Sequence, residues 1–209
     1  MDGGLVADVG TAGAYVVVDG LFVFMVGIAN AGRDRLVVVR LGGHREGAET
    51  AWQCAAREVH EEAGLRIRAV APPHTYWTGP EADASRLEVE PWPAQPGEEE
   101  APLLVAWRME AEKRRLSVNY LARSEGPATP GNEAAGLLLL RPSEVLRLVR
   151  GPVTLREYLG AGGLAVLREQ LPADFVLEPF LQLRVLAALM ERHPTLATSQ
   201  WALRGGAEQ

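Results

Sequence analysis

Runs of apolar residues divide the first part of the chain into short strands. Two runs, Gly13–Val18 and Leu21–Ile28, flank Asp19-Gly20, a dipeptide typical of the tight turn of a β-hairpin. A third run, Asp34–Leu41, is rich in valine and leads directly into two consecutive glycines. The pattern predicts three β-strands ahead of this glycine pair.

The spacing then becomes helical. Residues 50–63 mix alanines with charged side chains and are followed by Gly64, a residue type that commonly ends a helix. Further short runs predict strands at 65–71, 86–90, 103–110, 116–122 and 135–140, and a helix at 142–149. From Pro152 to His193 the apolar spacing is mainly helical, with a wide apolar stripe in its last part.

These elements predict an α/β (α+β) fold in which a mixed sheet lies between helices. We expect one domain over residues 1–150 and a helical C-terminal extension over residues 151–209. Because its helical stripe is apolar, this extension is expected to pack on the domain or to form an oligomer interface.

Composition limits the classes of partner. The chain has 209 residues, of which 47% are apolar, and a net charge of -6. The negative balance gives no general attraction to long nucleic acid or to an anionic membrane. Asp19 interrupts the most apolar N-terminal stretch, which argues against a membrane span. The single cysteine, Cys54, permits no intramolecular disulfide, and with no basic segment near Met1 we expect a cytoplasmic protein.

Three glutamates crowd the end of the predicted helix. Glu58, Glu61 and Glu62 have the spacing i, i+3, i+4, so they lie on one arc and repel one another. They also face the negative end of the helix dipole. A solvated helix face is the simpler explanation for charged residues. Mg²⁺, or Mn²⁺, would however remove the repulsion, since hard cations prefer oxygen ligands.

The segment from Gly43 to Leu65 resembles the Nudix box, G-x5-E-x7-R-E-U-x-E-E-x-G-U, where U is aliphatic. Every fixed position matches without a gap: Gly43, Glu49, Arg57, Glu58, Val59, Glu61, Glu62, Gly64 and Leu65. Nine constrained positions make this a specific signal. The resemblance implies a Nudix-like αβα sandwich over roughly residues 10–150.

The resemblance also assigns metal ligands. It implies that Glu58 and Glu62 are the main ligands of a divalent cation and that Glu61 is a ligand or supports one. The backbone carbonyl of Gly42 or Gly43 is a further candidate ligand.

Other positions of the box carry supporting roles. The resemblance implies that Arg57 orients the glutamates through paired hydrogen bonds. Glu49 belongs to the loop before the helix, where it and Gly43 and Gly64 form the structural frame of the motif.

The reaction implied by the family is hydrolysis of the P–O–P bridge of a nucleoside diphosphate linked to another group. A carboxylate near the metal would take the proton of the attacking water. Glu133, in a Gly/Pro-containing loop, is the first candidate for this base, and Glu125 is the second.

The sequence says less about the substrate. Pro80 stands fifteen residues after Leu65, a position that marks ADP-ribose hydrolases in this family. Tyr76 and Trp77 are candidates for stacking on a nucleobase. An ADP-ribose-type substrate is therefore favoured over a nucleoside triphosphate or capped RNA.

A function of another class stays open. A Nudix-like sensor would bind a nucleotide without cleaving it, although such a protein would be expected to lose box glutamates. Since many relatives dimerise and the C-terminal helix is apolar, we expect a homodimer that binds a small nucleotide derivative.

Overall fold

The computed structural model describes residues 8–29, 34–79, 87–93, 97, 100–110 and 113–194. Within these ranges the helices are α1 (Ala51–Ala63), α2 (Pro142–Arg150), α3 (Leu155–Gly160) and α4 (Leu181–Arg192). The strands are β1 (Asp8–Val18), β2 (Leu21–Ile28), β3 (Arg35–His44), β4 (Ile67–Ala69), β5 (Tyr76–Thr78), β6 (Glu88–Val89), β7 (Leu104–Glu110), β8 (Lys113–Ser124), β9 (Gly136–Leu140), β10 (Leu164–Leu167) and β11 (Val176–Pro179).

The described strands form one mixed sheet in the order β10-β9-β2-β3-β1-β8-β7-β5-β6. β1 pairs with β8 in parallel and with β3 in antiparallel orientation. β11 adds to β3 in parallel, and β4 adds to β8. The predicted mixed sheet is confirmed.

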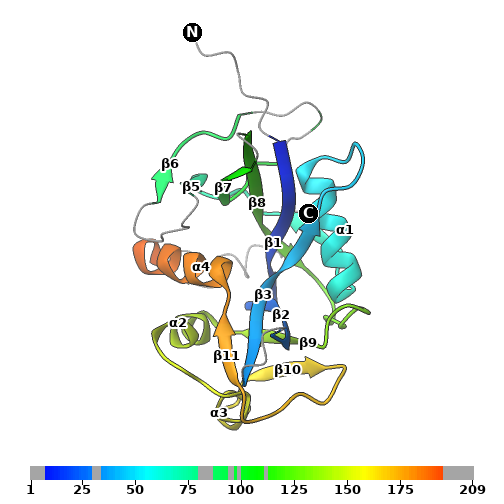
Figure 1. Ribbon diagram of the computed structural model, residues 1–209, viewed down its shortest axis with the longest axis vertical. Helices are drawn as coiled ribbons and strands as arrows, with labels where there is room; N and C mark the ends of the chain where they lie inside the picture. Colours follow the sequence, from blue (N-terminus) through cyan, green and yellow to red (C-terminus); the bar gives the residue numbers. More distant parts are fainter. Residues whose placement is uncertain are drawn as a thin grey trace, which may run out of the picture.

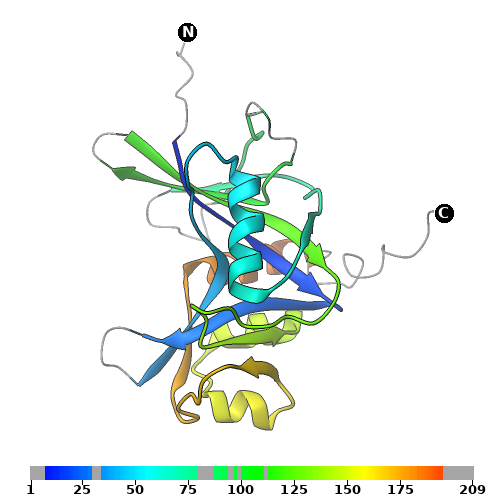
Figure 2. The ribbon, with the colours of Figure 1, turned by 90° about the vertical axis from the view of Figure 1, so that its right-hand side faces the viewer.

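Helices cover both faces of this sheet. Figure 1 shows α1 and α4 on opposite sides of β1 and β3, and Figure 2 shows α1 in front of the strands with α4 behind them. One apolar core joins the sheet to α2, α3 and α4, and a second joins it to α1. This arrangement agrees with the predicted αβα sandwich. Within the described ranges, no helix combines the length and the apolarity needed to cross a membrane.

The local predictions for the first part of the chain are confirmed. The hairpin β1–β2 turns at Asp19-Gly20, both of which have positive φ. α1 begins after Thr50, whose hydroxyl accepts from Gln53 N at 3.1 Å while Gln53 Oε1 accepts from Thr50 N at 2.9 Å. This reciprocal pair fixes the start of the helix. Gly64, in the left-handed conformation, ends it.

The sequence pattern predicted a helical segment after residue 151, but the described part of this segment is not helical throughout. It contains the short helix α3 and the long helix α4, but also β10, which pairs with β9, and β11, which pairs with β3. Each of these strands is four residues long, so its conformation depends on a partner strand that is distant in sequence. The C-terminal extension therefore completes the sheet and the core.

Truncating Leu177 is expected to show that β11 belongs to this core. Its side chain is 1% exposed and lies in the core with α4. Leu177→Ala should lower the free energy of unfolding by about 2–5 kcal/mol, because a cavity is left in a packed interior. The measurement is urea unfolding. Leu167→Ala, at an exposed leucine of β10, is the matched control and should change the stability by well under half as much; equal losses would contradict a core role for β11.

Candidate active site

The end of β3 and the start of α1 form one unit around the glycine pair. β3 continues through Gly42 and Gly43 to His44, and α1 packs against β1 and β3. The inner face of α1 buries mostly small residues: Ala51, Cys54, Ala55, Val59 and Ala63. Cys54 is fully buried. The last two turns of the helix carry Glu58 and Glu62, whose carboxylates reach the glycine pair.

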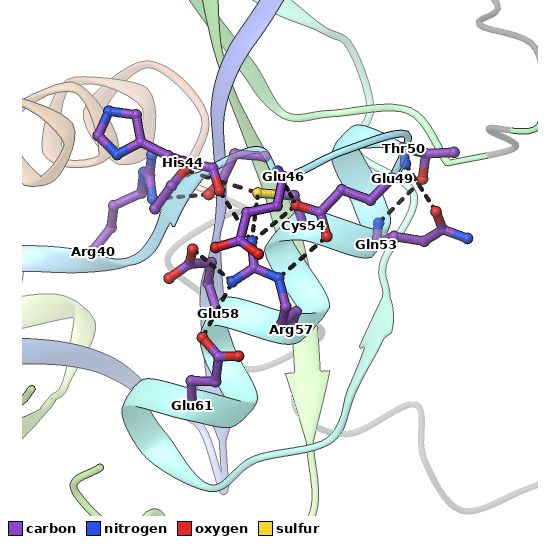
Figure 3. A network of polar contacts seen from close by, with 12 residues as sticks. Arg40, His44, Glu46, Glu49, Thr50, Gln53, Cys54, Arg57, Glu58 and Glu61 are labelled. Atoms are coloured by element: carbon purple, nitrogen blue, oxygen red, sulfur yellow. Dashed lines mark hydrogen bonds and ion pairs between the residues drawn. The ribbon is translucent and has the colours of Figure 1, made fainter. Parts of the chain in front are cut away.

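Arg57 is the centre of the polar network. Its Nη2 and Nε donate to the two carboxylate oxygens of Glu49 at 2.9 and 3.2 Å. Its Nη1 donates to Glu58 Oε1 at 2.9 Å and to Glu61 Oε2 at 3.1 Å, and its Nη2 also donates to the carbonyl of His44. Figure 3 shows the guanidinium between these three carboxylates. The paired bonds fix the orientation of Glu49 against Arg57, whereas Glu58 and Glu61 each accept a single bond from the same guanidinium.

These contacts shift the pKa of both partners. Hydrogen bonds from Arg57 lower the pKa of Glu49, and the bonds to Glu49 and Glu58 raise the pKa of Arg57. The ion pair therefore stays charged across the physiological range. Glu61 is more exposed than Glu58, with 57% of its side chain accessible against 14%, so it lies at the outer edge of the network.

Glu62 lies on the inner side of the helix end. It is 6% exposed, and its Oε2 accepts a hydrogen bond from Gly42 N at 2.7 Å. Burial raises the pKa of its carboxyl to about 7, and the charges of Glu58 and Glu133 add to the rise. A buried carboxylate with two acidic neighbours is unfavourable unless a cation compensates it.

Glu58 approaches the backbone at Gly43. A Cβ placed on Gly43 would come within 2.5 Å of the Glu58 carboxyl atoms, so a larger residue there would displace this side chain. Gly43 is thus needed for close approach, and the carboxylates of Glu58 and Glu62 reach neighbouring positions along the same short stretch of β3.

The loop before β9 is attached to the end of α1. Gly131 N donates to the carbonyl of Glu62 and Thr129 N to that of Ala63, both at 2.8 Å. A Cβ on Gly131 would lie 1.7 Å from the carbonyl oxygen of Glu61, so only glycine fits at position 131. Glu133 of this loop is exposed, acts electrostatically on Glu62 and lines a cavity of about 290 Å³. Glu125 is also exposed, but it does not line this cavity.

A second cavity, of about 540 Å³, opens beside the glycine pair. The lining includes Gly42, Gly43, Trp107 and the first residues of α4. Two candidate stacking residues do not line it: Tyr76 is buried, and Trp77 packs beside Trp92. Pro80, the third substrate candidate, lies outside the described residues.

The donor atoms around the glycine pair suit a hard divalent cation. The carboxylates of Glu58 and Glu62 supply oxygen ligands, and Glu62 has no ion pair with Arg57 to offset its charge. Among the described residues, no group of three or more Asp, Glu, His or Cys side chains is placed to hold a metal ion by itself. Two glutamates and backbone or water oxygens are therefore the donors that fit.

Arg40 lines this cavity but was not among the site residues predicted from the sequence. Arg40 is 5% exposed and lies between the cavity and the box glutamates, whose charges act on it. A signal was present, because Leu36, Val38 and Arg40 alternate on one face of β3 and the first two are fully buried. A charged residue in phase with a buried face indicates a functional position.

Comparison with known proteins gives structural similarity only. No family model and no curated protein sequence matches the chain. A NUDIX-family hydrolase from Clostridium perfringens is 17% identical, with 67% of this chain and 85% of that chain covered and a TM-score of 0.43. The Ap4A hydrolase of C. elegans is 14% identical, with 66% and 84% covered and a TM-score of 0.42.

The MutT protein of Methanosarcina mazei Go1 is 14% identical, with 69% of this chain and 85% of that chain covered and a TM-score of 0.42. At TM-scores below 0.5, the residues of the motif themselves remain the basis of the comparison. With every fixed position present and the glutamates gathered at the glycine pair, this chain resembles the Nudix hydrolases.

Proposed function

We propose that the protein is a Nudix-type pyrophosphohydrolase that needs a divalent cation and cleaves a P–O–P bridge in a small nucleotide derivative. The observation that carries the proposal is the placement of Glu58 and Glu62 against the glycine pair, with Arg57 holding Glu58. The carboxylates repel each other in this arrangement, and a helix face that only contacts solvent would gain nothing from such repulsion.

Glu58 and Glu62 would hold the cation, Mg²⁺ or Mn²⁺, with Glu61 at the edge of the site and the carbonyl of Gly42 or Gly43 as a further donor. When bound, such a cation neutralises charge on the phosphates and lowers the pKa of bound water. Arg57 keeps the carboxylate of Glu58 directed toward the glycines, and through Glu49 it ties the helix to the preceding loop.

Glu133 is the preferred general base of the proposal. Its loop is attached to the last carbonyls of α1, and its charge acts on Glu62, so it lies near the position where water would attack. Its exposure leaves the carboxylate accessible to take a proton and pass it to solvent. Glu125 is the weaker candidate.

An ADP-ribose-type compound is the favoured substrate. The support is the sequence position of Pro80, whose location the structure does not describe. Hydrolysis of nucleoside triphosphates is the alternative reaction, and nucleotide binding without turnover is the alternative function. A homodimer and a cytoplasmic location are also part of the proposal.

Product release tests the proposal directly. The full chain is incubated with Mg²⁺ and, separately, with ADP-ribose, NADH, dinucleoside polyphosphates and deoxynucleoside triphosphates, and the products are separated by chromatography. We expect AMP and ribose 5-phosphate from ADP-ribose, with no turnover in a chelator. Nucleotide binding without turnover of any compound would overturn the enzymatic proposal in favour of a sensor.

A further inference from the structure

The turn that carries Glu133 is attached to the rest of the protein on two sides. On one side, Gly131 N donates to the carbonyl of Glu62 at 2.8 Å, at the end of α1. Within the turn itself, Ala134 N donates to the carbonyl of Gly131 at 3.3 Å, a long bond that is weak on its own. Glu133 lies between the two ends of this turn, so its place depends on what else holds Gly131.

The other attachment comes from the C-terminal extension. Arg168, directly after β10, donates from Nη1 to the same carbonyl of Gly131 at 2.8 Å. The backbone amides of Arg168 and Glu169 both donate to the carbonyl of Ala135, at 3.0 and 3.1 Å. These bonds reach the chain two residues before and two residues after Glu133. The turn is therefore held by α1 through the N–H of Gly131 and by Arg168 through its carbonyl.

The backbone of Arg168 is itself fixed by the sheet. β10 pairs with β9, and the last pair of this ladder joins Leu167 to Gly136. The two strands are close here, because a Cβ on Gly136 would lie 2.7 Å from Leu167 Cδ2 and 3.1 Å from the carbonyl oxygen of Val166. Since the ladder already orders the main chain, the side chain of Arg168 loses less entropy when it bonds to the turn.

The turn needs this attachment because its charge is placed unfavourably. Glu133 and Glu169 line the same cavity of about 290 Å³, and the charge of Glu133 also acts on Glu62. Like charges repel one another, and an exposed turn can relieve the repulsion by moving toward solvent. Arg168 opposes this movement through its hydrogen bond and through the positive charge that it brings to the turn.

We propose that Arg168 is a positioning residue for the hydrolysis: it holds the turn at Gly131, so that the carboxylate of Glu133 stays beside the end of α1. The C-terminal extension thus contributes to the reaction of its own chain through the loop before β9. The inference rests on the proposed function in taking Glu133 as the general base, but the attachment of the turn can be measured without turnover.

Steady-state kinetics of the full chain with Mg²⁺ test this role on the substrate that the product panel identifies. Arg168→Met should lower kcat about tenfold and change KM by less than about twofold, since a displaced base loses part of the roughly 10²–10⁴-fold that it supplies. Arg168→Lys should recover most of kcat, because a single bond to a carbonyl needs one donor. Arg156→Met, at an exposed arginine of the same extension that pairs with Asp174, is the matched control and should leave kcat unchanged.

A double variant shows whether Arg168 acts through Glu133. In a Glu133→Gln background, Arg168→Met should lower kcat by less than about twofold, because the base that it positions is no longer present. A purely structural role would give the same loss of about tenfold in both backgrounds, since the two changes would then be independent. That result would overturn the inference.

Hydrogen exchange separates a failure of this inference from a failure of the proposed function. Measured by mass spectrometry on the ligand-free proteins, the amides of residues 129–135 should exchange faster in Arg168→Met than in the wild type and in Arg156→Met, because the turn opens more often. Equal exchange in the three proteins, or an unchanged kcat in Arg168→Met, would overturn the positioning role. A wild type that hydrolyses none of the compounds would overturn the proposed function instead, and the exchange comparison would still decide whether Arg168 holds the turn.

Discussion

Glu58→Gln and Glu62→Gln should each lower kcat/KM for Mg²⁺-dependent hydrolysis by on the order of 10³-fold. Each change replaces a carboxylate that is proposed to bind the cation with a neutral amide of nearly the same shape. If these side chains hold the cation as proposed, several kcal/mol of transition-state stabilisation depend on them, and about 1.4 kcal/mol corresponds to a factor of ten. The measurement is the initial rate of product formation from the substrate that the panel identifies.

Matched variants separate metal binding from other roles of glutamate. Glu88→Gln removes an exposed carboxylate on β6 and should leave the rate unchanged. Glu133→Gln should lower kcat by about 10²–10⁴-fold while Mg²⁺ affinity, measured by calorimetry, changes little, because a general base acts on the proton of water. Hydrolysis that survives in both Glu58→Gln and Glu62→Gln would contradict the proposed site.

The parts of the fold with local signals could be predicted from the sequence. Asp19-Gly20 specifies a turn by its backbone preferences, and Thr50 and Gly64 specify the two ends of a helix. The spacing of Glu58 and Glu62 gives their shared arc without knowledge of the tertiary structure. Such features need only a few neighbouring residues, which explains why the structure reproduces them.

The tail could not be predicted in this way. β11 is in a strand conformation because it pairs with β3, which precedes it by more than a hundred residues, and its four residues carry no pattern of their own. The same applies to the cavity, whose walls come from β3, β7, β8 and α4.

Glu62 links the fold to the proposed chemistry, because its position is unfavourable for stability in the absence of a cation. The hydrogen bond from Gly42 N and the charge of Arg40 lower the pKa of Glu62, but burial and two acidic neighbours outweigh them and raise it to about 7. Sites that bring like charges together in this way are characteristic of function. The unfavourable position of the Glu62 carboxylate should therefore lower the measurable stability of the metal-free protein.

Glu62→Gln is expected to make the metal-free protein more stable at alkaline pH. In the unfolded chain this carboxyl has the ordinary pKa of 4.5, and in the folded chain the pKa is about 7. Between these values the folded state keeps a proton that the unfolded state releases, so stability falls as pH rises through this window. Above about pH 8 the loss amounts to about 3 kcal/mol, which glutamine, being neutral, avoids.

Urea unfolding with a chelator present, at about pH 5 and about pH 8.5, measures this difference. At the acidic pH, where Glu62 of the folded chain is still protonated, the two proteins should differ by less than about 1 kcal/mol, and Glu62→Gln should be clearly the more stable at the alkaline pH. Adding Mg²⁺ should then stabilise the wild type more than the variant, because only the wild type has the carboxylate to bind it. A variant that is no more stable at alkaline pH would show that the folded protein accommodates this negative charge without a cation, and the physical reason for a metal at this position would be lost.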